Sequence, residues 1–344
     1  MAETASRRAP LIAVIIPAYR VRSHILSVLA RIGPEISRVF VVDDDCPMQS
    51  GDFVEQTCTD PRVVVLRNKE NQGVGGAVVA GYQAAIAEGM DILVKVDGDG
   101  QMDPALISQL AAPILNGASD YTKGNRFFSP EAIEGMPLAR LIGNMGLSFL
   151  TKLSSGYWDI LDPTNGFTAI HARVANALPF EKLAKRYFFE SDLLFRLSTL
   201  RAVVTDVPMA SVYSHGASSL NAAKMVLPFL YRNLLNWWKR IAYSYFVRGF
   251  SFASLCLVVG APLFGFGAVF GLARWVESSH LERDTPAGII MLAVVPLLVG
   301  FQLLLAFVAA DIASVPTKPL HSVLSIRPLK ALQHFDTQTA CDGR

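Results

Sequence analysis

Two long apolar segments near the C-terminus constrain the fold of this chain more than any other feature of its sequence. Residues 249–273 and residues 287–310 contain no charged side chain. Each segment exceeds the roughly 20 residues that an α-helix needs to cross a bilayer. A buried helix of a soluble protein rarely reaches this length without a charge. The two segments therefore predict a transmembrane hairpin.

Basic residues gather on both outer flanks of the predicted hairpin. They are Lys239, Arg240 and Arg248 before the first segment, and Lys318, Arg327 and Lys330 after the second. The rule that positive charge stays on the cytoplasmic side then predicts that the N-terminal domain and both termini are cytoplasmic. We expect an integral membrane protein, with a bacterial inner membrane as its location.

The composition changes near residue 220. Residues 225–246 mix leucine and aromatic side chains with lysine and arginine, a pattern typical of amphipathic helices at a membrane surface. An ordinary core helix is the alternative. The expected division is an α/β domain over residues 1–220, juxtamembrane amphipathic helices over 221–248, the two-span hairpin over 249–313 and a cytoplasmic tail over 314–344.

The first hundred residues alternate β-branched apolar runs with helical stretches. The predicted strands are residues 11–16, 39–42, 62–66 and 92–96, with helices ending near residue 32 and covering 73–87. This alternation predicts a mainly parallel sheet joined by right-handed crossovers. Ligands of such sheets bind beyond the carboxyl ends of the strands. Acidic clusters end two of the strands, at residues 43–45 and at Asp97 and Asp99, so we expect both on one face.

The sequence Asp97-Gly98-Asp99-Gly100-Gln101 follows the fourth predicted strand. Glycine allows a sharp turn, and two carboxylates with a further oxygen donor suit a hard divalent cation that also binds phosphates. An acidic turn without a ligand is the alternative. The glycines at residues 73–76 match neither phosphate-loop pattern. The net charge of +2 gives no electrostatic case for nucleic acid as a partner.

Several motifs together resemble those of inverting family 2 glycosyltransferases of the GT-A fold. In chain order they are Ile15-Ile16-Pro17-Ala18-Tyr19, Val41-Val42-Asp43-Asp44, Asn71-Gln72-Gly73-Val74-Gly75-Gly76-Ala77 and Val96-Asp97-Gly98-Asp99-Gly100-Gln101. Gly124-Asn125-Arg126-Phe127, Arg140 and Asp162-Pro163-Thr164-Asn165-Gly166-Phe167 resemble the branch of dolichyl-phosphate mannose synthases and bacterial polyprenyl-phosphate glycosyltransferases. A two-span C-terminal anchor also occurs in that branch. The resemblance covers residues 11–220.

The resemblance implies a Rossmann-like GT-A domain that transfers one sugar, with inversion, from a UDP- or GDP-sugar to undecaprenyl or dolichyl phosphate. It implies Mg²⁺ or Mn²⁺ as cofactor, bound by Asp97, Asp99 and Gln101. The implied nucleotide-binding residues are Pro17, Ala18, Tyr19, Asp44, Gly75 and Asp97. Arg126 and Arg140 would bind the acceptor phosphate, and Asp99 and Asp162 are the residues assigned to catalysis.

Some roles and functions stay open at this point. Asp162 either orients the acceptor, acts as a base, or is a turn residue before Pro163. Glu190 and Asp192 either reach the site or begin a solvated helix. A processive polysaccharide synthase is one alternative function, although its Gln-x-x-Arg-Trp motif is absent. A catalytically inactive, membrane-tethered nucleotide-sugar-binding protein is another. The expected partners are the nucleotide sugar, the polyprenyl phosphate and the bilayer; a homo-oligomer is left open.

Overall fold

The computed structural model describes residues 8–128, 138–209 and 222–324. Contacts within the chain divide it into two compact units. The first unit consists of residues 1–236 together with residues 316–344, and the second consists of residues 237–315. The chain therefore leaves the first unit, forms the second, and returns to the first.

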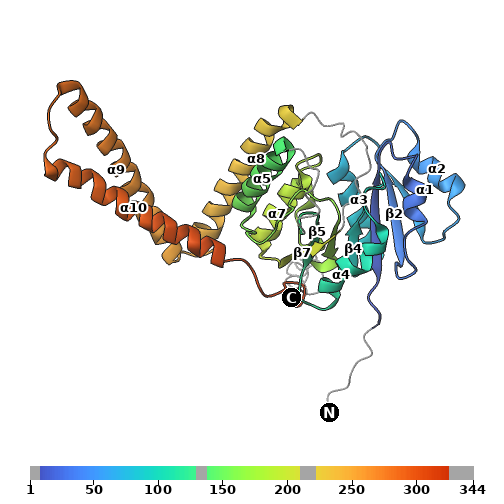
Figure 1. Ribbon diagram of the computed structural model, residues 1–344. Helices are drawn as coiled ribbons and strands as arrows, with labels where there is room; N and C mark the ends of the chain where they lie inside the picture. The colour runs from blue at the N-terminus through green and yellow to red at the C-terminus, as the bar shows by residue number, and fades with distance from the viewer. Residues whose placement is uncertain (1–7, 129–137, 210–221, 325–344) are drawn as a thin grey trace, which may run out of the picture. The chain divides into compact units, whose positions relative to one another are not determined.

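A seven-stranded sheet with the strand order β3-β2-β1-β4-β6-β5-β7 forms the centre of the first unit (Figure 1). Its strands are β1 (Ile12–Ala18), β2 (Arg38–Asp43), β3 (Val63–Arg67), β4 (Ile92–Lys95), β5 (Tyr121–Asn125), β6 (Thr168–His171) and β7 (Val204–Pro208). The mainly parallel sheet is confirmed, and the four predicted strands all form. Strand β6 is the antiparallel exception, because it runs opposite to both β4 and β5. The amino end of β6 and the carboxyl ends of the other six strands therefore meet at one edge.

Helices cover both faces of this sheet. The helices of the first unit are α1 (Ile25–Leu29), α2 (Ser50–Thr57), α3 (Val74–Ala87), α4 (Ile107–Leu115), α5 (Leu138–Ser155), α6 (Ala172–Asn176), α7 (Phe189–Leu200) and the first part of α8 (Ala222–Ala242). Short 3₁₀ turns lie at Pro104–Leu106 and Phe180–Lys182. Helix α1 ends at Leu29, earlier than the expected end near residue 32.

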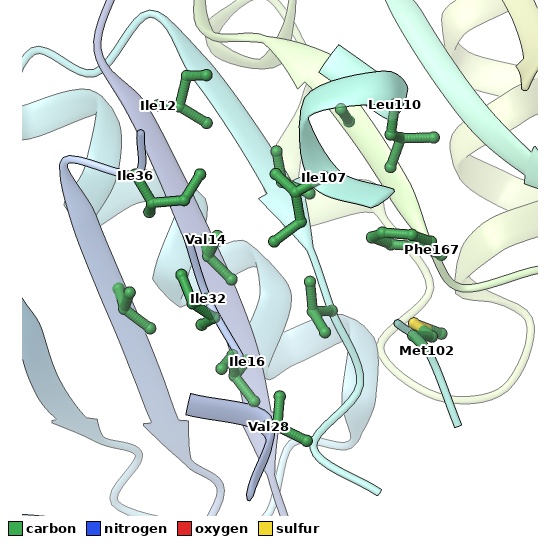
Figure 2. Packing of buried hydrophobic residues seen from close by; sticks show 14 of the residues in the cluster. Ile12, Val14, Ile16, Val28, Ile32, Ile36, Met102, Ile107, Leu110 and Phe167 are labelled. Atoms are coloured by element: carbon green, nitrogen blue, oxygen red, sulfur yellow. The ribbon is translucent and has the colours of Figure 1, made fainter. Parts of the chain in front are cut away.

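The apolar core explains why the strand sequences are continuously apolar. Val14 and Ile16 of β1 pack on one face, together with Val28 of α1 and with Ile107 and Leu110 of α4 (Figure 2). Each of these side chains is at most 1% exposed, and burying one contributes about 1.5–3 kcal/mol. The residue between them, Ile15, faces α3 so closely that a Cβ at Gly81 would overlap it. A strand that is covered on both faces has an almost continuously apolar sequence.

The segment that follows the second unit binds the first unit at the opposite edge of the sheet, where β5 and β7 begin. We call residues 319–324 the return segment. The carboxylate of Asp120 is fully buried and accepts hydrogen bonds from the backbone N–H groups of Val203 (2.8 Å), Leu320 (2.7 Å) and His321 (2.8 Å). Nδ1 of His321 also lies 2.7 Å from Oδ1 of Asp120.

Two further side chains hold the return segment. The imidazole of His321 stacks on that of His171 with 4.5 Å between ring centroids. Burial lowers the pKa of His171 to about 4, so this ring is neutral at neutral pH and does not repel its neighbour. Nη1 of Arg173 donates to the carbonyl oxygens of His321 (3.2 Å) and Leu324 (3.4 Å). The return segment is therefore held through both its backbone and a side chain.

Substituting Asp120→Ala is expected to release the return segment and to lower the stability of the first unit. A hydrogen bond to a charged group contributes about 1.5–3 kcal/mol, so losing several of them should cost at least about 3 kcal/mol. Thermal unfolding in detergent and protease cleavage near residue 320 measure the two effects. The exposed residue Asp159 supplies the control, Asp159→Ala. An Asp120→Ala protein that melts and is cleaved like the control would contradict this role.

The second unit contains two long apolar helices, α9 (Phe252–Leu281) and α10 (Ala287–Ala313), which run side by side (Figure 1). By length and composition, both can cross a membrane. Only 17% and 11% of their most apolar windows are buried, whereas a core helix of a soluble protein is mostly buried. Helix α9 continues past the predicted end at residue 273 because the backbone first turns at Glu282, which has φ 48°. By their length and composition, the two long helices favour association with a membrane.

Close packing and one buried ion pair hold the second unit together. A Cβ at Gly267 of α9 would lie 2.5 Å from the backbone nitrogen of Leu297 in α10, so a small residue is needed where the helices touch. Asp311, near the end of α10, accepts from Nη1 of Arg240 (2.6 Å), Nη2 of Arg240 (3.0 Å) and Oη of Tyr245 (2.6 Å). These bonds satisfy a carboxylate that is only 4% exposed.

Candidate functional site

The predicted cation-binding residues form a tight turn after β4. Oδ1 of Asp99 accepts a hydrogen bond from the backbone N–H of Gln101 (3.0 Å), and Gly100 between them has φ 78°, which favours glycine. Burial raises the pKa of Asp99, and the charge of Asp97 raises it further. The two carboxylates are therefore close enough to interact, and the amide of Gln101 lies on an exposed side chain of the same turn.

The chemistry of this turn fits a divalent cation that is shared with a substrate. Among the described residues, no three histidine, cysteine, aspartate or glutamate side chains form a ready-made metal cluster. Asp97, Asp99 and Gln101 offer two carboxylates and one amide oxygen. Mg²⁺ typically takes one or two protein carboxylates and completes its shell with phosphate oxygens and water. The donor set is thus that of a cation held jointly by protein and diphosphate.

A buried lysine lies directly beneath this turn. Nζ of Lys95 is 2.8 Å from Oδ1 of Asp97 and 3.3 Å from Oε1 of Glu190, and the lysine side chain is only 1% exposed. Burial lowers the pKa of Lys95, but the charges of the two carboxylates outweigh burial and the pKa is raised. The ammonium group is therefore charged. Lys95 was not among the residues predicted from the sequence, although a lysine inside the apolar run Leu93-Val94-Lys95-Val96 is a detectable signal.

The two acidic residues at the start of α7, Glu190 and Asp192, have different partners and therefore different roles. Glu190 is 14% exposed and contacts Lys95 at the site. Asp192 is buried and accepts from Ala184 N (2.9 Å), Arg196 Nε (3.1 Å) and Asn236 Nδ2 (3.2 Å), which are structural partners. Sequence alone left both roles open because both residues lie in the first turn of the same helix.

Arg126 and Asp162, predicted from separate motifs, form an ion pair after the end of β5. Nε and Nη2 of Arg126 donate to the two carboxylate oxygens of Asp162 at 2.7 Å and 3.0 Å. Asp162 is fully buried, whereas Arg126 is 33% exposed. Such a two-point bond fixes the plane of the guanidinium. These contacts favour an orienting role for Asp162, and its catalytic role stays a prediction. Arg140 lies in the first turn of α5, and its side chain is outside the part that the structure describes.

Asp44 organises the glycine-rich turn that precedes α3. Its carboxylate is 2% exposed and accepts from Asn68 Nδ2 (2.7 Å), Gln72 N (2.9 Å) and Gly73 N (2.7 Å). Gly75, in the first turn of α3, donates its backbone N–H to the carbonyl of Lys185 (2.8 Å). Both residues thus have structural partners, and their predicted contacts with a nucleotide stay predictions.

The remaining predicted nucleotide-binding residues lie at the carboxyl end of β1. Ala18 is buried and Pro17 is partly buried. Tyr19 is 42% exposed, and the guanidinium of Arg20 lies over its ring at 5.3 Å from the centroid. An exposed aromatic ring next to a cation at this edge can stack on a base, and this role also stays a prediction.

Comparison with known proteins defines the class. Residues 13–178 match the family model described as glycosyl transferase family 2, and this span contains the Asp97 turn, Arg126 and Asp162. The chain therefore contains a glycosyltransferase family 2 domain, and the protein is a glycosyltransferase.

Two curated relatives are named for lipid acceptors. The chain is 28% identical over 240 residues to the UDP-N-acetylglucosamine–dolichyl-phosphate N-acetylglucosaminyltransferase of Methanococcus voltae, covering 65% of this chain and 95% of that protein. It is 29% identical over 202 residues to the undecaprenyl-phosphate mannosyltransferase of Micrococcus luteus, covering 58% and 82%. The relatives transfer different sugars, so they do not identify the sugar used here.

Solved structures support the fold. The glucosyl-3-phosphoglycerate synthase of Mycobacterium tuberculosis, in complex with Mn²⁺, UDP and phosphoglyceric acid, superposes with a TM-score of 0.51 at 20% identity, covering 66% of this chain and 78% of that chain. The same enzyme in complex with Mg²⁺ and UDP also gives 0.51 at 20% identity, covering 66% and 79%. This likeness confirms the expected GT-A architecture.

Proposed function

We propose that this protein transfers a single sugar, with inversion, from a UDP- or GDP-sugar to a polyprenyl phosphate at a membrane surface. One observation carries the proposal: the Asp97–Asp99 turn after β4 and the Arg126–Asp162 pair after β5 lie on either side of β6 at the same edge of the sheet. The carboxylates of the Asp97–Asp99 turn suit a cation and a diphosphate, and the guanidinium of Arg126 suits a second phosphate. The names of the curated relatives support the same pair of substrates.

On the donor side, Asp97, Asp99 and Gln101 would hold Mg²⁺ or Mn²⁺ against the diphosphate. A bound cation supplies Lewis-acid stabilisation of the charge that develops on the departing nucleoside diphosphate. The solved structures that contain UDP with Mn²⁺ or Mg²⁺ support this role. Asp44, with Pro17, Ala18, Tyr19 and Gly75, would form the nucleotide pocket.

On the acceptor side, the nucleophile needs to be positioned rather than deprotonated. A phosphate monoester has a second pKa of about 6, so the lipid phosphate is largely ionised at neutral pH. Arg126, held in plane by Asp162, and Arg140 would bind its oxygens through forked N–H donors. A phosphate oxygen that attacks the anomeric carbon opposite the departing diphosphate inverts the configuration there.

Exposed apolar side chains support a lipid acceptor and a membrane location. Ile142, Met145 and Phe149 of α5 are 61%, 63% and 56% exposed, and their spacing places them along one side of the helix. Helices α9 and α10 would form the membrane-spanning hairpin. A hairpin of two spans leaves both of its ends on the same side of the membrane, and the positive flanks favour the cytoplasm for that side.

A donor panel tests the proposal. The full-length protein in detergent is incubated with Mn²⁺ and with either undecaprenyl phosphate or dolichyl phosphate. Each reaction contains one donor from a set of UDP- and GDP-sugars. The masses of the lipid products are then measured by mass spectrometry. We expect one donor to add the mass of a single sugar to the lipid. A ladder of sugar masses would instead indicate a processive synthase. Nucleotide-sugar binding without transfer across the whole panel would indicate an inactive binding protein and would reject the proposal.

A further inference from the structure

A row of polar side chains crosses four strands just below the site. Lys95 of β4 is paired in register with Thr168 of β6, Thr168 is paired with Lys123 of β5, and Lys123 is paired with Asp206 of β7. The first three are at most 2% exposed. Charged residues in the interior of a sheet cost desolvation energy unless each one has partners. The hydrogen-bond partners of these charged side chains therefore indicate which part of the structure the charges support.

All three charged members of the row hold one loop, residues 161–166. Nζ of Lys95 donates to the carbonyl of Gly166 (3.2 Å), and Nζ of Lys123 donates to the carbonyl of Asn165. At the other end of the loop, the backbone N–H of Leu161 donates to Oδ2 of Asp206 (2.7 Å). The same loop carries Asp162, which orients Arg126. The row thus supports the acceptor side of the proposed site.

Lys95 differs from Lys123 in what else it touches. Its ammonium group also contacts Asp97 at 2.8 Å and Glu190 at 3.3 Å. The loop, the lysine and the carboxylate converge so tightly that a Cβ at Gly166 would lie 2.5 Å from Nζ of Lys95 and 2.7 Å from Oδ2 of Asp97. Lys95 therefore joins two carboxylates and a loop carbonyl, whereas the described hydrogen bond of the Lys123 ammonium is to the loop carbonyl of Asn165.

We infer that Lys95 is a positioning residue that holds Asp97 in place for the cation and, through the Gly166 carbonyl, fixes the acceptor-side loop relative to the donor side. The inference rests on the proposed function, since it assigns Asp97 to the donor cation. A methionine in place of Lys95 would fill the strand at a lower desolvation cost, but Asp97 would lose the partner that sets its orientation. Substituting a residue that holds a metal ligand in place typically lowers the metal affinity by about 10- to 100-fold.

The test compares Lys95→Met with Lys123→Met, because both remove a buried ammonium and a bond to a neighbouring loop carbonyl. Mn²⁺ binding to the full-length protein in detergent, with UDP present, is measured from the electron paramagnetic resonance signal of free Mn²⁺. We expect Lys95→Met to raise the Mn²⁺ dissociation constant by about 10-fold or more, and Lys123→Met to change it by less than about twofold. In transfer assays both variants should raise the acceptor KM, and only Lys95→Met should also raise the Mn²⁺ requirement.

A second variant covers the case in which Lys95→Met does not fold. Lys95→Met combined with Glu190→Gln removes one charge of each sign, and it should still bind Mn²⁺ weakly if Lys95 positions Asp97. A folded Lys95→Met or double variant with wild-type Mn²⁺ affinity would overturn the inference, as would equal losses in Lys95→Met and Lys123→Met. The binding measurement needs neither sugar nor lipid. A wild-type protein that fails the donor panel, while Lys95→Met still loses Mn²⁺ affinity, would therefore reject the proposed function and leave the inference standing.

Discussion

Asp99→Ala is expected to lower kcat/KM for sugar transfer by at least about 1,000-fold, a loss of about 4 kcal/mol of transition-state stabilisation. The substitution removes one of the two carboxylates in the turn after β4, which we propose to hold the cation that balances charge on the departing diphosphate. The fold should persist, because the described contact of the Asp99 side chain is a bond to the backbone of Gln101 within the same turn. Initial rates at saturating lipid, with a Mn²⁺ titration, measure the loss.

Asp103→Ala is the matched control for Asp99→Ala. Asp103 is an acid in the same loop, and its carboxylate accepts from the backbone N–H of Ala105 at the start of a 3₁₀ turn (3.1 Å). Losing this cap should cost about 1 kcal/mol of stability and leave the Mn²⁺ requirement unchanged. Near-normal turnover of Asp99→Ala, with a melting temperature equal to that of wild type, would remove Asp99 from the metal site.

Arg126→Ala is expected to lower kcat/KM for the lipid acceptor by about 100-fold, while the affinity for the nucleotide donor stays within about twofold. A hydrogen bond to an ionised group contributes about 1.5–3 kcal/mol, and each 1.36 kcal/mol corresponds to a factor of ten in rate. The effect should fall mainly on the acceptor KM, because the proposed role of Arg126 is to bind the lipid phosphate. Varying polyprenyl phosphate at saturating donor separates the acceptor KM from kcat.

Two companion variants sharpen the test of Arg126. Arg126→Lys keeps the charge but not the two-point bond to Asp162, so its acceptor KM should lie between those of wild type and Arg126→Ala. Asp162→Asn should raise the acceptor KM in the same direction and add little when it is combined with Arg126→Ala. A fall in kcat without any change in acceptor KM would instead support the base role of Asp162. An acceptor KM that Arg126→Ala leaves unaltered would exclude Arg126 from the phosphate site.

The sequence was most informative where local physics decides the structure. Residues 249–273 and 287–310 are long and uncharged, and they form α9 and α10. The β-branched runs form β1 to β4, as the strand propensity of valine and isoleucine predicts. The Asp97–Asp99 turn follows β4 as expected, since glycine at positive φ permits it there. In these cases each residue's neighbours in sequence are also the neighbours that determine its conformation.

Tertiary structure decided the features that depend on residues far apart in the chain. The antiparallel direction of β6 brings residues 161–166 to the carboxyl edge of β4 and β5. This places Asp162 beside Arg126. Other long-range contacts give Glu190 and Asp192 different partners. A further one buries Asp120 under the return segment.

Lys95 shows the difference most clearly. The sequence by itself determined that a lysine stands in a buried strand, two residues before a pair of carboxylates. Only the fold decided that Glu190 and the Gly166 carbonyl, 95 and 71 residues further along the chain, would meet its ammonium group. A buried charge is stable only with partners, and partners supplied from distant segments do not leave a periodic pattern near the residue that they stabilise.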